Sequence, residues 1–189
     1  IEHEFSDATL AFTRDLFVFA CFTALSFADI RELTTGEIID VNGEKWIISK
    51  RHKTGIPFQV KLLDIPLQII GKYRPFQKDN SVFGEINYWN VCKKLKKVIS
   101  ECGINKQISF HCSRHTFCIL ALSRGMPIES VSRVLGHTNI KTTQIYAKIT
   151  TQKLGNDLTA FGNQLNQTFG NIKVAGYETD NNYDGRVRQ

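Results

Sequence analysis

The chain has 189 residues, a formal net charge of +6 and a pI near 9.1, which allows one sizeable domain with extensions and favours a polyanionic partner. Its five cysteines have no regular spacing, which argues against a disulfide framework and for a reducing cytoplasm. No apolar run approaches the length of a membrane span, and no signal peptide is visible.

A strongly apolar helix is predicted near the start of the chain. Ser6 or Asp7 can cap it. Apolar residues fall on nearly all its sides over 16–25, so we expect a central, buried helix. A short second helix should follow over 27–33, with Ser26 at its start.

The pattern changes from helix to strand over 37–63. Runs over 37–40 and 45–50 flank Asn42-Gly43, a strong hairpin signal. A longer connection leads to a third strand over 58–63. We therefore predict a mainly α-helical fold that carries a small three-stranded antiparallel β-sheet.

Helical spacing returns in the second half of the chain. A helix over 87–102 is amphipathic, and its lysine-rich side is more typical of a solvated face than of a DNA-reading surface. The other helices are expected over 66–73, 111–124, 127–135, from 140 to about 149, and over 151–165.

Several polar residues recur in a fixed order on these last helices. His111 and Arg114 lie three positions apart and so share one helical face. Gly136 ends the next helix just before His137, and Tyr146 lies on the helix after that. Singly, each is more often structural than functional. Jointly, the order H-x-x-R, L-G-H and Tyr resembles the catalytic core of the tyrosine recombinase (phage-integrase) family.

The resemblance implies metal-free attack by Tyr146 on a DNA phosphodiester, which would leave a 3′-phosphotyrosyl bond and require no cofactor. His111 would help the phenol to lose its proton or would hold the phosphate. Arg114 and His137 would donate hydrogen bonds to the non-bridging oxygens. Lys53, in the connection HKTG between two strands, would protonate the departing 5′ oxygen.

One position departs from the family pattern G-L-R-x-x-E-L, whose arginine is a second phosphate ligand. The matching stretch is 24–30, where Ser26 replaces that arginine and Asp29 keeps the acidic character. Integrases of Bacteroides-type conjugative transposons resemble this variant. Arg51 precedes Lys53 by two residues and would share its face on a strand. Arg51 is therefore the candidate replacement, with contact to the DNA backbone beside the site as the alternative.

A zinc site is the competing interpretation of the same region. His111, His115 and Cys118 could line one helical face, with Cys112 nearby. No second cluster of the C-x-x-C or H-x-x-x-H kind completes such a site in the sequence. We therefore predict no metal.

The resemblance covers roughly residues 7–165. We expect residues 1–165 to be a tyrosine recombinase catalytic domain and 166–189 to be a polar, flexible tail. The chain begins at Ile1 and runs straight into a helical pattern, so the family's N-terminal DNA-clamping domain is expected to be absent from it.

The implied activity is site-specific strand exchange on double-stranded DNA through a Holliday junction. Such exchange implies a homotetramer on paired sites, although the fragment alone could be a monomer. It also implies that the protein works in the bacterial cytoplasm, at the nucleoid. Two alternatives stay open. One is a nicking and resealing enzyme that resembles type IB topoisomerases, and the other is a DNA-binding module impaired by the missing arginine.

Overall fold

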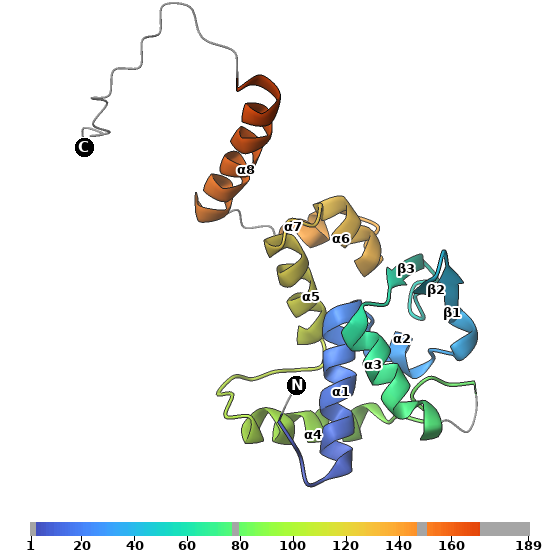
Figure 1. Ribbon diagram of the computed structural model, residues 1–189. Helices are drawn as coiled ribbons and strands as arrows, with labels where there is room; N and C mark the ends of the chain where they lie inside the picture. The colour runs from blue at the N-terminus through green and yellow to red at the C-terminus, as the bar shows by residue number, and fades with distance from the viewer. Residues whose placement is uncertain (1–2, 77–79, 147–150, 171–189) are drawn as a thin grey trace, which may run out of the picture. The chain divides into compact units, whose positions relative to one another are not determined.

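The computed structural model describes residues 3–76, 80–146 and 151–170. It divides into two compact units, residues 1–148 and 149–189, which are considered separately. The predicted fold class is confirmed, because the first unit is mainly helical and carries a three-stranded antiparallel sheet (Figure 1). Among the described helices, none has the length and apolar character that crossing a membrane requires.

Helix α1 (Ala8–Thr23) forms the centre of the first unit (Figure 1). The Asp7 carboxylate caps it by accepting a hydrogen bond from the Thr9 N–H at 2.7 Å. The helix ends at Ala24, which adopts the left-handed conformation with φ of 57°. Three helices pack around it, which explains its predominantly apolar sequence: α3 (Asp64–Tyr73), α4 (Tyr88–Glu101) and α5 (Cys112–Ser123).

The sheet has the strand order β1-β2-β3. Asn42 and Gly43, with φ of 55° and 81°, make the predicted hairpin turn between the first two strands. Ile47 lies opposite Ile38 on one side and Val60 on the other, so the sheet turns one apolar face to the core. The strands are β1 (Ile38–Val41), β2 (Glu44–Lys50) and β3 (Pro57–Lys61).

Two hydrophobic clusters hold the first unit together. The larger one joins α1, the short helix α2 (Phe27–Arg31), the sheet, α3 and α4, and its fully buried members include Leu16, Phe19, Ile30, Ile47 and Leu95. The smaller one joins α5 to α6 (Ile128–Leu135) around Ala24, Cys118, Leu122, Val131 and Leu135. Val134 packs against both clusters, so the two meet beside α6.

Three short helical segments differ from the prediction. The 3-10 turn η1 (Thr35–Glu37) precedes β1 where a strand was expected to begin, and η2 (Arg74–Phe76) follows α3. Helix α7 (Lys141–Gln144) is a single turn, so Tyr146 lies just beyond it rather than within it. The predicted continuation to about residue 149 falls outside the described residues.

The second unit contains helix α8 (Thr151–Phe169), which continues past the predicted end at Leu165. Its large apolar side chains recur at helical spacing and are exposed: Leu154, Leu158, Phe161 and Leu165. Helix therefore extends into the segment predicted to be a flexible tail. The rest of that tail, from residue 171, lies outside the described residues.

Candidate active site

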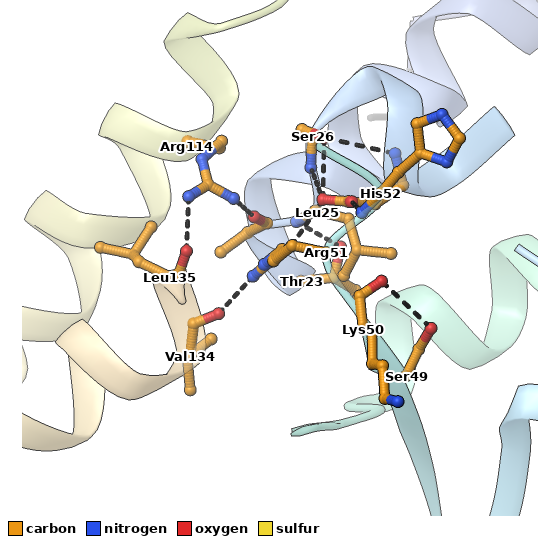
Figure 2. Close-up of polar contacts among 12 residues, drawn as sticks. Thr23, Leu25, Ser26, Ser49, Lys50, Arg51, His52, Arg114, Val134 and Leu135 are labelled. Atoms are coloured by element: carbon orange, nitrogen blue, oxygen red, sulfur yellow. Dashed lines mark hydrogen bonds and ion pairs between the residues drawn. The ribbon is translucent and has the colours of Figure 1, made fainter. Parts of the chain in front are cut away.

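A buried ion pair connects the turn after β2 to helix α2. Arg51 Nη1 lies 2.7 Å from Asp29 Oδ2, and the two side chains are 6% and 4% exposed. Arg51 Nη2 donates to the carbonyl of Val134 (Figure 2). Its guanidinium carbon lies 3.9 Å from the centre of the Phe58 ring. Its Nε is buried without a hydrogen-bond partner among the described residues. The arginine thus joins three separate elements.

The expectation that Arg51 and Lys53 share one face of a strand was wrong. Strand β2 ends at Lys50, and Arg51 opens a tight turn in which its carbonyl accepts from the Gly55 N–H at 2.7 Å. The two-residue alternation of a strand does not continue through a turn. Arg51 is therefore buried, whereas the Lys53 side chain is exposed.

Ser26, at the position of the family arginine, caps helix α2. Its hydroxyl accepts from the Asp29 N–H at 3.2 Å and donates to Asp29 Oδ2 at 2.8 Å, and its own N–H donates to the same oxygen at 3.0 Å. This is a capping box. The His52 N–H donates to the other carboxylate oxygen at 3.0 Å. Burial raises the pKa of Asp29, but these hydrogen bonds and the charge of Arg51 lower it below its ordinary value, so Asp29 is ionised.

Arg114, on α5, approaches the same region from the other side, and its guanidinium contacts two backbone carbonyls. Its Nη1 donates to the carbonyl of Ala24, and its Nη2 donates to that of Leu135 at 2.7 Å. Burial lowers the pKa of Arg114 to about 10, and the charge of Arg51 contributes to the decrease. The guanidinium is still protonated at neutral pH. The two carbonyls occupy part of its set of N–H donors and leave the others for a ligand.

His137 completes the polar group on this side of the site. Its Nδ1 lies 2.9 Å from the Thr143 hydroxyl, which orients the ring. Burial lowers the pKa of His137, and the charges of Arg114 and Arg51 lower it further, so the imidazole is predominantly neutral at pH 7. The structure thus brings Arg51, Arg114 and His137 into one electrostatic neighbourhood.

Gly136, at the end of α6, allows Arg51 to pack closely. Its φ is 66°, and a Cβ added there would lie 2.9 Å from Arg51 Nε. Gly136→Ala should therefore lower the free energy of unfolding by roughly 1–3 kcal/mol through backbone strain, with a further loss from displacement of Arg51. Gly125→Ala is the matched control, because Gly125 also follows a helix with φ of 86° but has no atom within 4 Å of its added Cβ. Equal losses in urea unfolding of the two variants would contradict crowding at Arg51.

The Tyr146 phenol contacts a histidine that the family pattern does not assign. The Tyr146 hydroxyl oxygen lies 2.5 Å from His115 Nδ1. His115 in turn stands edge-on to His111, with ring centroids 4.7 Å apart. The structure therefore places His115 between the nucleophile and the histidine that sequence reasoning gave it as partner. The sequence signal for this contact is the second histidine of H-x-x-R-H, His115, which the sequence pattern alone presents only as a possible zinc ligand.

Tyr146 and Arg114 influence each other electrostatically. Burial raises the pKa of Tyr146, Cys118 raises it further, and the positive charge of Arg114 lowers it. The tyrosine ring also packs against the smaller hydrophobic cluster. The phenol is therefore held near a cation but stays protonated at neutral pH.

Lys53 is the predicted site residue that the structure does not tie to the others. It lies at the exposed turn between β2 and β3, and its ammonium makes no hydrogen bond or ion pair with any described residue. Within that same part of the chain, no group of three or more His, Cys, Asp or Glu side chains is arranged to hold a metal ion.

Known sequences resemble this chain over most of its length. The phage integrase family model matches residues 4–153. The tyrosine recombinase XerA of Pyrococcus horikoshii is 32% identical over 136 residues, which cover 66% of this chain and 47% of XerA. The tyrosine recombinase XerD of Listeria monocytogenes is 40% identical over 67 residues, or 35% of this chain and 22% of XerD. The chain thus spans less than half the length of these relatives.

Solved structures with the same fold include two recombinases. The XerH site-specific recombinase, in a post-cleavage complex with palindromic difH substrate, matches with a TM-score of 0.67 and 19% identity over 85% of this chain and 49% of its own. The Tn1549 transposon integrase, in complex with circular intermediate DNA, matches with a TM-score of 0.64 and 16% identity over 81% of this chain and 59% of its own. The sequence match, the shared fold and the ordered site residues agree: this chain belongs to the phage integrase family of tyrosine recombinases.

Proposed function

We propose that this chain catalyses site-specific recombination by cutting and rejoining double-stranded DNA through a 3′-phosphotyrosyl intermediate. The observation that carries the proposal is the pair of guanidinium groups of Arg51, which is buried, and Arg114, which is partly buried, together with a Tyr146 phenol whose pKa the charge of Arg114 lowers. Family membership supports the reaction class.

The two arginines suit a bound phosphodiester because they concentrate positive charge where water is scarce. A cation in a buried site is little screened by salt or solvent. Arg114 offers its remaining N–H donors to the non-bridging oxygens, and His137 offers a neutral hydrogen bond beside them. Arg51 supplies the second charge, oriented by Asp29, in place of the arginine that Ser26 replaces. The site thereby stabilises the charge that develops in the transition state.

Tyr146 attacks the phosphorus, and the 5′ oxygen of the next nucleotide leaves. The phosphotyrosyl ester keeps the energy of the broken bond, so religation needs no external energy source. The departing alkoxide is strongly basic and requires a proton at neutral pH. Lys53 is our candidate donor, because its exposed turn can approach a DNA strand that lies on the site. His111, exposed at the start of α5, is the candidate for a further phosphate contact.

Replacing Lys53 tests the assignment of the general acid. Lys53→Ala should slow cleavage of ordinary DNA by about 10²–10⁴-fold, the usual range for such catalysis. A substrate with sulfur in place of the 5′ leaving oxygen needs little protonation, so it should be cleaved by the variant at close to the wild-type rate. Single-turnover rates on both substrates provide the measurement. Equal slowing on both would make Lys53 a phosphate-binding residue instead.

The assembly and setting are part of the same proposal. Strand exchange between two duplexes requires four active sites, so we propose a homotetramer on paired DNA sites. The XerH recombinase is bound to its difH substrate and the Tn1549 integrase to circular intermediate DNA, which supports a DNA partner. The transposon origin of the second protein supports a mobile-element role. A reducing bacterial cytoplasm suits the free cysteines of the described residues.

A suicide substrate tests the function as a whole. A duplex with a nick just to the 3′ side of the cleavage site loses the short fragment that carries the new 5′ hydroxyl, so it should trap a covalent protein–DNA complex on a denaturing gel. Exchange of labelled strands between two duplexes should follow on intact sites. Adducts without exchange would favour a nicking and resealing enzyme, and binding without adducts would indicate a DNA-binding module.

A further inference from the structure

His115 is in direct contact with the proposed nucleophile, Tyr146, but the mechanism above assigns it no role. His115 Nδ1 lies 2.5 Å from the Tyr146 oxygen, and the two rings are 5.2 Å apart at 49°. The phenol makes no other hydrogen bond with the described residues. A phenol ionises near pH 10, so its attack at neutral pH calls for a base within hydrogen-bond distance.

Helix α5 presents Arg114 and His115 in different directions. Consecutive residues lie about 100° apart around a helix. Arg114 therefore reaches the carbonyls of Ala24 and Leu135, whereas His115 reaches Tyr146. The helix thus offers a phosphate-binding group on one side and a base on the next. The Tyr146 ring packs against the smaller hydrophobic cluster, which α5 and α6 share.

We propose, on the basis of the recombinase function above, that His115 accepts the phenolic proton of Tyr146 during strand cleavage. The imidazole is then neutral, with Nδ1 as the acceptor and its proton on Nε2. As the bond from the tyrosine oxygen to phosphorus forms, its O–H bond breaks and a proton binds Nδ1. The bond from phosphorus to the 5′ oxygen breaks, and that oxygen takes a proton from Lys53.

Religation reverses each transfer. The 5′ hydroxyl attacks the phosphotyrosyl phosphorus and returns its proton to Lys53, while the departing phenolate recovers its proton from His115. No oxidant, metal or other co-reactant enters either direction. The same two groups therefore act as acid and base in turn, as reversibility requires.

The surroundings of Tyr146 and His115 support the role of His115 as a base. The pKa of Tyr146 is raised mainly by burial, so spontaneous loss of its proton is disfavoured. His111 stands on the far side of His115 and is exposed, which leaves it free to meet a phosphate. Of the two alternative roles that the resemblance implies for His111, help with the proton therefore falls to His115, and contact with the phosphate stays with His111.

The test compares cleavage rates of the protein and its variants on the suicide substrate at saturating DNA. His115→Ala should react about 10²–10⁴-fold more slowly, with unchanged DNA affinity. Replacement of Tyr146 by trifluorotyrosine, whose phenol ionises at lower pH, should restore most of the lost rate, because a more acidic nucleophile needs less help from a base. His111→Ala with the same replacement is the control, and it should gain much less.

Each other outcome overturns the inference. Wild-type adducts together with an unimpaired or faster His115→Ala would show that the contact only holds the resting tyrosine, and the recombinase function would stand. A slow variant without rescue by trifluorotyrosine would make His115 a merely orienting residue. Absence of adducts from the wild type would remove both proposals. If circular dichroism shows that His115→Ala does not fold, His115→Gln, which can accept a hydrogen bond but not the proton, is subject to the same criteria.

Discussion

Tyr146→Phe should abolish covalent protein–DNA adducts while leaving DNA affinity unchanged. The substitution removes only the oxygen that attacks phosphorus, and the ring can keep its packing against the smaller hydrophobic cluster. Because the proposed mechanism assigns the attack to this one oxygen, the expected loss is complete rather than partial. Denaturing gels of the suicide-substrate reaction measure the adduct, and filter binding at matched salt measures affinity.

Tyr88→Phe is the control for this substitution. Tyr88 is 43% exposed on helix α4 and lies outside the family motif, so adduct formation should continue at the wild-type rate. Adducts that persist in Tyr146→Phe would identify a different nucleophile and remove the basis of the proposed mechanism.

Arg51→Ala should reduce the cleavage rate at saturating DNA by about 10²–10³-fold, the usual cost of losing one transition-state donor. It should also destabilise the fold by roughly 3–5 kcal/mol, because Asp29 is left buried and unpaired. Adding Ser26→Arg returns a guanidinium to the position where the family carries it, within reach of Asp29. The double variant should therefore recover both stability and much of the cleavage rate.

Lys50→Ala is the matched control for charge. Lys50 is exposed at the end of β2, one residue from Arg51, so its loss changes the net charge equally but should leave the rate on saturating DNA nearly unchanged. Ser26→Ala should cost about 1 kcal/mol of stability through the lost cap and affect cleavage little. A folded Arg51→Ala variant that cleaves at the normal rate once bound would restrict Arg51 to a structural role.

Much of the fold could be predicted because its signals are local. Asp7 caps the helix that it precedes, and Asn42-Gly43 turns the hairpin, as short-range patterns indicated. The single turn of α7 could not be predicted, since a helix that short has too few residues for a periodic pattern. The extent of α8 was likewise underestimated, because polar residues in its last turn resemble a tail.

Local sequence patterns predicted only part of the candidate site. The order of His111, Arg114, His137 and Tyr146 indicated the chemistry, because these residues lie close together in sequence. The burial of Arg51 depends on Asp29 and Val134, which are distant along the chain. Such contacts follow from the packing of α2 and α6 around a turn, and no periodicity encodes them.

The attachment site of DNA on the trapped covalent complex tests the central claim most directly. The suicide-substrate adduct would be digested with protease and nuclease, and the peptide that carries the residual nucleotide would be sequenced by mass spectrometry. The account predicts a nucleotide joined through its 3′ phosphate to the oxygen of Tyr146. Attachment through a 5′ phosphate, attachment to another residue, or cleavage without any covalent intermediate would contradict it.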